Sequence, residues 1–164
     1  MNLVLDASVC LKWYLADDFP EPDSAIARDV LERVVSGGIN LHQPAIWRSE
    51  VIAVIARKLP AETAQFVHEL CEFVVATNDS AALLARAGSL STSLNHHLFD
   101  TIYHALAIEY GIDLVTADEH YYRKARGLGS IVLLKDWRWK PQGVSESHIE
   151  SKAKPRRPRK ARSR

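Results

Sequence analysis

The sequence predicts an α/β fold in which helices cover a doubly wound parallel sheet. Short apolar runs typical of buried strands alternate with longer segments whose apolar residues recur every three or four positions. Strands that alternate with helices in this way form parallel βαβ units. A length of 164 residues and a hydrophobic content of 47% suit one domain with its own core.

The first half of the chain begins with a buried strand over residues 2–6 and a helix over residues 7–16. Two prolines and an acidic cluster at residues 17–22 interrupt the apolar period and predict a loop. A helix over residues 23–36 then ends at a pair of glycines. A short strand over residues 39–42 follows.

The next helix is expected to start at Pro44, because proline is tolerated in a first turn, and to run to residue 59. Pro60 starts another helix, and the apolar run at residues 73–76 is a strand candidate. The same patterns of apolar residues, continuous runs for strands and a spacing of three or four for helices, predict the remaining elements. They are helices over residues 79–94, 98–110 and 119–125, and strands over residues 113–116 and 130–134.

Charge is distributed unevenly along the chain. Residues 152–164 hold eight of the 21 Lys and Arg residues and no acid, which leaves 13 basic and 20 acidic residues and a net charge of −7 before them. We therefore expect a folded domain over residues 1–141 and a disordered basic tail over residues 142–164, too poor in apolar residues to fold alone. Such a tail adds salt-sensitive affinity for phosphates, or is a solvated extension.

The two cysteines, Cys10 and Cys71, fall in apolar helical stretches without CxxC spacing, and we expect buried free thiols rather than a zinc site or a disulfide. No apolar run approaches the roughly 18 residues of a membrane span, and the chain opens on a strand rather than a signal peptide. These features predict a cytoplasmic protein that does not bind membranes.

Four carboxylates are predicted to meet in one acidic pocket. Asp6 and Asp118 each follow an apolar run, and in open α/β sheets ligands bind at the carboxyl ends of the strands. Glu50 and Asp100 lie within helical patterns, and Glu50 has apolar neighbours among which an unpaired carboxylate would be costly to bury. Carboxylates this close repel one another unless a cation holds them ionised, and a hard divalent ion such as Mg²⁺ or Mn²⁺ fits oxygen ligands.

Each acid also has a purely structural explanation. Asp6, Asp100 and Asp118 could each cap a helix that begins directly after them, since Asp is a favoured N-cap. Glu50 could form a salt bridge with Arg48 or Arg57, although neither arginine lies at the spacing of three or four residues at which side chains of a helix meet.

Four motifs combine these acids with their neighbours. They are Val4-Leu5-Asp6-Ala7-Ser8-Val9 with Lys12-Trp13, Pro44 with Trp47-Arg48-Ser49-Glu50-Val51, Phe99-Asp100-Thr101-Ile102-Tyr103-His104-Ala105-Leu106-Ala107, and Leu114-Val115-Thr116-Ala117-Asp118. In order and spacing they resemble the motifs of PIN-domain ribonucleases, most of all the VapC toxins of bacterial and archaeal toxin–antitoxin pairs. The resemblance runs from Asn2 to about Leu134, and implies a three-layer α/β/α sandwich with a central parallel sheet.

The resemblance also implies roles for individual residues. Ser8 and Thr116 match motif hydroxyls that orient the carboxylates or their waters. The catalytic quartet, which would also supply the ligands of Mg²⁺ or Mn²⁺, consists of Asp6, Glu50, Asp100 and Asp118.

Basic residues near the motifs are weaker candidates. Lys12 and Arg48 flank two motifs and are candidates for contact with RNA phosphates, with a solvated helix face as the alternative. His96 and His97 stand in a polar stretch and are expected to be surface residues. One position departs from the family: many relatives carry Asn three residues after the motif glutamate, where this chain has Ala53 and loses a supporting hydrogen bond.

These observations predict a Mg²⁺- or Mn²⁺-dependent endoribonuclease that is the toxin of a type II toxin–antitoxin system. The resemblance implies a homodimer and a VapB-type antitoxin whose segment crosses the acidic groove. Two alternatives keep the fold: a housekeeping PIN-domain nuclease that processes RNA, and an inactive PIN-like binding module. The four intact acids argue against the binding module.

Overall fold

The computed structural model describes residues 1–15 and 22–139 and is built around a parallel sheet of five strands in the order β3-β2-β1-β4-β5. The sheet confirms the predicted α/β class with a central parallel sheet. Its strands are β1 (Asn2–Leu5), β2 (Asn40–Pro44), β3 (Ala76–Asn78), β4 (Asp113–Thr116) and β5 (Ile131–Leu133).

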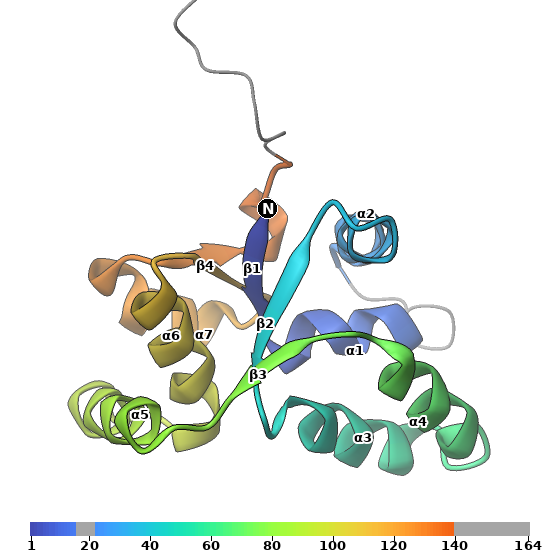
Figure 1. Cartoon of the computed structure of the whole chain (residues 1–164), viewed down its shortest axis with the longest axis horizontal. Helices are drawn as coiled ribbons and strands as arrows, with labels where there is room; N and C mark the ends of the chain where they lie inside the picture. The colour runs from blue at the N-terminus through green and yellow to red at the C-terminus, as the bar shows by residue number, and fades with distance from the viewer. Residues whose placement is uncertain (16–21, 140–164) are drawn as a thin grey trace, which may run out of the picture.

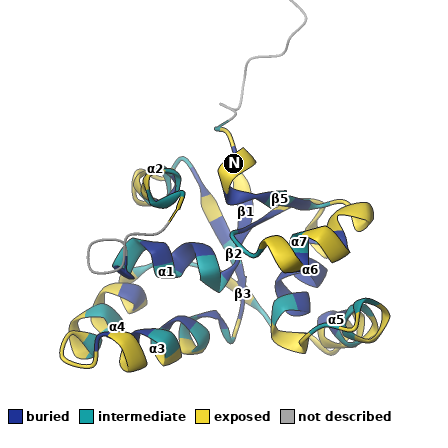
Figure 2. Ribbon diagram, turned by 180° about the vertical axis from the view of Figure 1, so that it is seen from behind, coloured by how far each residue is buried: buried dark blue, intermediate teal, exposed yellow. Residues whose placement is uncertain are grey.

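Helices cover both faces of this sheet, as the predicted three-layer α/β/α sandwich requires (Figures 1 and 2). One face carries α1 (Ala7–Leu15), α2 (Ser24–Val35), α3 (Trp47–Lys58) and α4 (Thr63–Glu72). The other face carries α5 (Ala81–Leu94), α6 (Leu98–Tyr110) and α7 (Glu119–Ala125). Two short 3₁₀ turns, η1 (Arg126–Leu128) and η2 (Leu134–Asp136), flank the last strand.

The order in which strands are added to the sheet reverses between the parallel strands β1 and β4. The chain leaves β1 into α1 on one face of the sheet, whereas it leaves the neighbouring strand β4 into α7 on the opposite face (Figure 1). The two connections therefore separate above the carboxyl ends of β1 and β4. Such a reversal point is the place where open α/β sheets bind ligands.

The core lies where α6 packs against the middle of the sheet. Leu3, Val4 and Leu5 of β1 are fully buried, as are Leu114 and Val115 of β4. Strands buried on both faces read as continuous apolar runs, which is why the sequence predicted them correctly. Every residue from Thr101 to Ala107 of α6 is buried, which makes α6 the central helix of its layer (Figure 2).

Two predicted boundaries around β2 and β3 are wrong. Pro44 does not open a helix: it is the last residue of β2 and pairs with Asn78, and α3 begins at Trp47. The third strand lies later than the predicted residues 73–76, because His42 of β2 pairs with Ala76. The apolar run that suggested a strand instead leaves Val74 fully exposed, and pairing with β2 decides the strand.

Among the remaining predictions, Cys10 is buried as expected, whereas Cys71 is exposed, which corrects that expectation. Parts of the predicted loop at residues 17–22, the end of the first helix at Ala16 and the predicted tail over residues 142–164 lie outside the described residues. Within the described residues, no helix has the length and apolarity that a transmembrane span needs.

Candidate functional site

Asp6 directly follows β1 and is held by two hydrogen bonds from separate parts of the chain. The hydroxyl of Thr116, the last residue of β4, donates to its Oδ2 at 2.6 Å, and the backbone N–H of Ser8 donates to its Oδ1 at 2.9 Å. The Asp6 N–H itself donates to the carbonyl of Val115 at 3.0 Å, which continues the β1–β4 pairing. Asp6 is only 7% exposed and therefore has a fixed carboxylate at the reversal point of the sheet.

Asp118 follows β4 by two residues, is connected to Asp6 through the Thr116 hydroxyl, and also caps α7. Its Oδ1 accepts a hydrogen bond from the N–H of Tyr121 at 2.9 Å, so the structural explanation of this residue as an N-cap is confirmed. Its own N–H donates to the Thr116 hydroxyl at 3.0 Å. The Ser8 hydroxyl accepts from the N–H of Ala117 at 3.1 Å. Ser8 and Thr116 thus tie the loops after β1 and β4 together.

Glu50 lies in the first turn of α3, and its partner comes from the opposite layer of helices. The hydroxyl of Tyr103 on α6 donates to Glu50 Oε2 at 2.5 Å. No arginine pairs with Glu50, which removes the salt-bridge alternative for this described residue. Tyr103 follows Asp100 by three positions, so the two share one face of α6. That spacing was a signal in the sequence that would have added Tyr103 to the site.

Asp100 lies in the first turn of α6, where His97 and not Asp100 occupies the N-cap position. The N-cap explanation is therefore wrong for this acid. Nε2 of His96 lies 3.0 Å from Asp100 Oδ2, an ion-pair distance, although the angle is not that of a hydrogen bond. The His96 side chain is only 9% exposed, so His96 is not the surface residue that its polar neighbours suggested.

Burial raises the pKa of three of the four acids, and their charges reinforce the effect. Burial is the main cause for Asp6, and the charge of Asp100 adds to it, while the Thr116 and Ser8 hydrogen bonds lower its pKa. Burial also raises the pKa of Glu50, helped by the charges of Asp6 and Asp100 and opposed by the Tyr103 hydrogen bond. Burial raises the pKa of Asp100, opposed by His96 and helped by Asp118. The four acids thus form one electrostatically linked cluster.

The cluster has the donor chemistry of a hard divalent cation, because all four groups are carboxylates whose mutual repulsion a cation would relieve. In the described ranges, no three His, Cys, Asp or Glu side chains lie close enough to share one ion. The donor chemistry of the four carboxylates thus fits a hard divalent cation, whereas the described side-chain positions do not form a metal site.

The two basic candidates lie in different surroundings. Lys12 is only 7% exposed on α1, so the solvated helix face predicted as its alternative is wrong. The guanidinium of Arg48 lies over the ring of Trp47 and donates to the carbonyls of Leu70 and Phe73, at 3.4 and 2.9 Å. Because these carbonyls belong to the end of α4, Arg48 has a structural role as a C-terminal cap of that helix.

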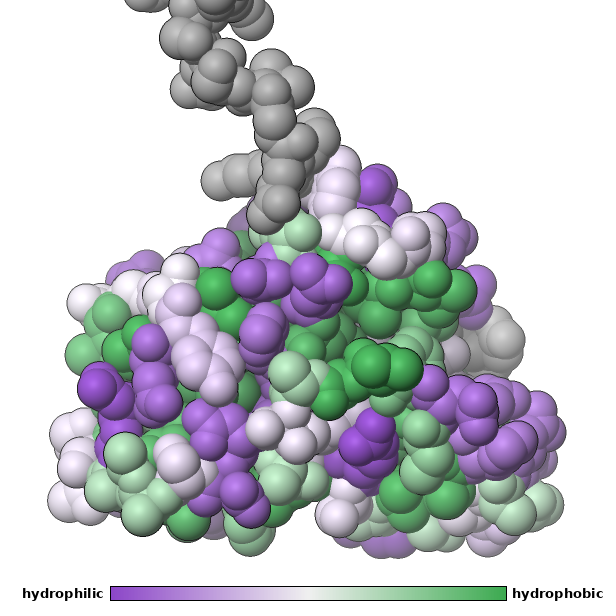
Figure 3. Space-filling model, viewed as in Figure 1, coloured by the Kyte–Doolittle hydropathy of each residue, from purple (hydrophilic) through white to green (hydrophobic). Residues whose placement is uncertain are grey.

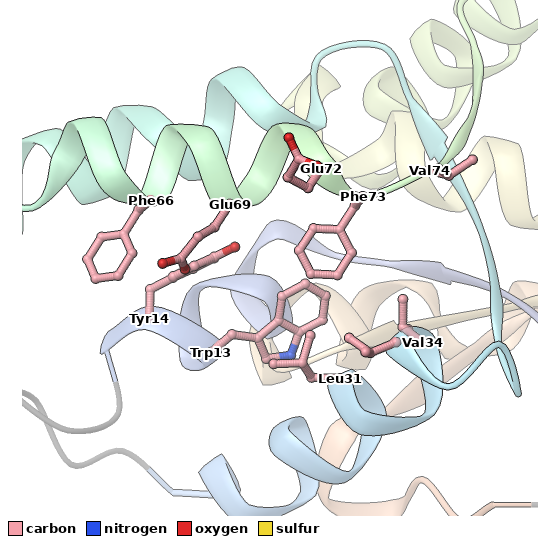
Figure 4. A pocket seen from close by; sticks show the side chains of 10 residues that line it. Trp13, Tyr14, Leu31, Val34, Phe66, Glu69, Glu72, Phe73 and Val74 are labelled. Carbon is pink, nitrogen blue, oxygen red and sulfur yellow. The ribbon is translucent and has the colours of Figure 1, made fainter.

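An apolar groove lies apart from the acids, between α1, α2 and α4 (Figure 4). Its cavity measures about 740 Å³. Trp13 stacks on Phe73 at a centroid distance of 5.7 Å, and Tyr14 lies 5.0 Å from Phe66. At the rim, Val35 is 73% exposed and Val74 fully exposed. Hydrophobic side chains gather on this face of the molecule around α2 (Figure 3).

Comparison with known proteins supports the same fold. Among solved structures, the chain is similar to FitAcB from Neisseria gonorrhoeae, with 18% identity, 82% of this chain and 99% of that chain covered, and a TM-score of 0.55. It is also similar to VapBC2 from Rickettsia felis bound to a promoter DNA fragment, with 18% identity, 81% and 97% covered, and a TM-score of 0.55.

A third similar structure is VapBC-1 from nontypeable Haemophilus influenzae, with 16% identity, 82% and 99% covered, and a TM-score of 0.58. At these identities the likeness shows the fold. No protein with curated annotation matches the chain. The sequence model described as "PIN domain" matches residues 3–127, which is most of the chain. The chain therefore belongs to the PIN domain family.

Proposed function

We propose that this protein is a Mg²⁺- or Mn²⁺-dependent endoribonuclease and the toxin of a type II toxin–antitoxin system. PIN domains are generally nucleases, so membership of the family supports hydrolysis of phosphodiester bonds. The observation that carries the proposal is the clustering of four carboxylates from four separate segments at the reversal point of the sheet. These carboxylates are Asp6, Glu50, Asp100 and Asp118.

Each acid would be a metal ligand, and its hydrogen bonds would orient it. When bound, a divalent cation supplies a nucleophilic water at neutral pH and neutralises charge on the phosphate oxygens. Thr116 and the Ser8 N–H hold the Asp6 carboxylate in one orientation, and Tyr103 leaves one oxygen of Glu50 available. Ser8 and Thr116 join the two loops that carry Asp6 and Asp118. The protein would thus arrange the ligands before substrate arrives, which is how second-shell contacts tune a metal site.

Lys12 and Arg48 both remain proposed RNA contacts, and Lys12 is the stronger candidate of the two. Lys12 lies on α1, which begins one residue after Asp6. Arg48 is held by the carbonyls at the end of α4, and its contribution would be to hold α4 against α3.

A protein partner distinguishes the toxin from the housekeeping alternative. The similar structures include VapBC and FitAB complexes, and we propose a VapB-type antitoxin as partner of this chain in the cytoplasm. The apolar groove between α1, α2 and α4 supports a protein partner, because exposed apolar patches mark interaction sites. We also propose a homodimer, as in the relatives that the motifs resemble.

Cleavage of RNA by purified full-length protein tests the proposal. We expect cleavage in Mg²⁺ or Mn²⁺, none in excess EDTA, and none by Asp6→Asn or Asp100→Asn. Glu32→Gln, which neutralises an exposed acid on α2, is the matched control and should cleave as the wild type does. Mapping of RNA ends in cells after induced expression of the wild type and Asp6→Asn then identifies the substrate. Full activity of Asp6→Asn in Mg²⁺ would refute the assignment.

A further inference from the structure

A second cavity lies directly beside the acidic cluster and is lined by a lysine and three histidines instead of acids. It measures about 470 Å³ and is lined by Asn95, His96, His97, His120 and Lys124. These residues come from two elements, the turn between α5 and α6 and the helix α7. We propose that this cavity is a phosphate-binding subsite that holds a backbone phosphate of the RNA strand next to the one at the carboxylates. The inference rests on the proposed nuclease function.

Lys124 is the charged group of the cavity, and its position is fixed although the side chain is exposed. The ammonium donates to the carbonyl of Asn95 at 2.9 Å and lies 3.4 Å from Nδ1 of His96. Asn95 has a positive φ of 45° at the end of α5 and thereby turns its carbonyl toward α7. An ammonium has three donors, so Lys124 keeps a donor for an anion after these two contacts.

The imidazoles bring further donors to the same space. The ring of His96 lies 5.7 Å from that of His120 and 6.2 Å from that of His97, measured between centroids. A neutral imidazole carries one N–H donor and a protonated one carries two, so the rings of His97 and His120 can each donate in either form, whereas both nitrogens of His96 already face Lys124 and Asp100. A cluster that contains an ammonium is a poor cation site, and no three of the described His, Cys, Asp or Glu groups form one. The cavity therefore suits an anion.

His96 connects this cavity with the acidic cluster. One ring nitrogen faces Lys124, at 3.4 Å, and the other faces Asp100, at 3.0 Å. Asp100 is the acid of the cluster that faces His96, and the exposed carboxylate of Glu119 on α7 is already paired with Lys135. Only the ring of His96 separates Asp100 from Lys124. An RNA strand whose scissile phosphate lies at Asp100 would therefore have its neighbouring phosphate close to the cavity.

The beginning of α6 adds to the positive potential. His97 occupies the N-cap position and its side chain makes no cap hydrogen bond, so the first N–H groups of this 13-residue helix are not capped by it. The N-terminus of a helix favours negative charge. A phosphate in the cavity would face Lys124 and the imidazoles, with the beginning of α6 directly after His97.

Binding of single-stranded RNA to full-length protein in the Asp6→Asn background tests the subsite without cleavage. We expect Lys124→Gln and the pair His97→Gln with His120→Gln each to weaken affinity about three- to tenfold, as loss of a phosphate contact should. For Lys124→Gln, the slope of log affinity against log salt should fall by about 0.7. Arg57→Gln on α3, in the opposite helix layer, makes the same change of charge and is the control.

Titration with inorganic phosphate, followed by NMR of the histidine ring protons, gives a second readout independent of RNA. The signals of His96, His97 and His120 should shift together and saturate, whereas those of His42 and His68, which lie elsewhere, should not. Equal RNA affinity of Lys124→Gln and Arg57→Gln, or equal shifts of all histidines, would overturn the subsite. RNA and phosphate binding with no cleavage by wild-type protein in Mn²⁺ would instead sink the proposed function and retain the subsite.

Discussion

The hydroxyl of Thr116 donates a 2.6 Å hydrogen bond to the carboxylate of Asp6, from a position 110 residues further along the chain. The same hydroxyl accepts the N–H of Asp118 at 3.0 Å. One buried oxygen atom therefore orients two members of the acidic cluster, and it joins the ends of β1 and β4.

Replacement of that hydroxyl by a methyl group tests this role. Thr116→Val should cost about 1–3 kcal/mol of unfolding free energy, because it leaves buried polar groups unpaired. It should also weaken Mn²⁺ binding about 10- to 100-fold, the usual effect of losing a supporting hydrogen bond. Denaturant unfolding and metal titration measure the two effects. Thr116→Ser keeps the hydroxyl and is the control; Mn²⁺ affinities that are equal in the two variants would exclude a role for this hydrogen bond.

Divalent metal should stabilise the folded protein. An ion that binds only the folded state raises its stability, by about 1.4 kcal/mol at ten times its dissociation constant. For a domain of this size the gain raises the Tm by roughly 3–6 °C. Glu50→Gln should reduce the shift and Glu32→Gln should not. A wild-type melting curve that millimolar Mn²⁺ leaves unmoved would show that the cluster is not a metal site.

The metal-free protein should lose stability as the pH rises from acid to neutral values. Burial raises the pKa values of Asp6, Glu50 and Asp100, so the folded state holds these protons more tightly than the unfolded chain does. The protonated acids therefore stabilise the fold at acid pH. This stabilisation is lost as the pH rises from the ordinary pKa values, 3.8 for Asp and 4.5 for Glu, through the raised pKa values of the folded state.

Denaturant unfolding in EDTA at several pH values measures this effect. The double variant Asp6→Asn with Asp100→Asn should gain stability relative to the wild type as the pH rises, because it has lost two of the titrating groups. If the difference in unfolding free energy between the double variant and the wild type does not change with pH, the charges of the cluster do not destabilise the fold.

The exposed rim of the apolar groove should decide binding of the protein partner. Val74→Asp should leave the fold unchanged, since the side chain is fully exposed, and should weaken binding of the cognate antitoxin by at least about tenfold. Leu84→Asp on α5, at a 44% exposed leucine in the opposite helix layer, is the matched control. Co-purification and calorimetry report the affinity. Undiminished binding by Val74→Asp would place the partner elsewhere.

Deletion of residues 151–164 should preserve folding and the chemical step while weakening RNA binding. The remaining residues carry a strong negative net charge, which repels a polyanion, whereas the deleted stretch holds eight cations. Salt dependence of RNA affinity should flatten accordingly, since each phosphate contact adds to the slope. The comparison uses the Asp6→Asn background in both lengths. Identical affinities and slopes would leave the tail as a solvated extension, and a rise in cleavage on deletion would point to a tail that covers the site.

The sequence predicted those parts of the fold that local pattern controls. The apolar run of β1 and the acid after it placed Asp6 at the carboxyl edge of the sheet, and the same reasoning placed Asp118 after β4. The third strand was displaced because Phe73, Val74 and Val75 look like a strand by composition, while backbone pairing of β2 selects Ala76 onward. Local composition carries no information about such pairing.

Within the site, contacts across the helix layers were beyond the reach of sequence pattern. The hydrogen bond between Tyr103 and Glu50 joins residues 53 positions apart on opposite sides of the sheet. The sequence predicts Arg48 as a candidate for phosphate contact because it stands next to a motif, but it cannot show that its guanidinium donates to the carbonyls of Leu70 and Phe73 at the end of α4. His104 of α6 has both ring nitrogens paired: Nδ1 lies 3.0 Å from the Tyr121 hydroxyl and Nε2 lies 2.8 Å from the Gly129 carbonyl.

Strand β1 pairs with β2 through only its first residues, Asn2 with Asn40 and Leu3 with Leu41. Beyond that point the buried side chain of Gln43 replaces the missing backbone: its Nε2 donates to the Leu5 carbonyl at 2.9 Å, and its Oε1 accepts the Leu5 N–H at 3.1 Å. Glu would lack the donor and Met would lack both groups. Few other side chains could make both hydrogen bonds at position 43, and a glutamine there in a distant sequence would mark the same separation of two strands beside the aspartate that follows β1.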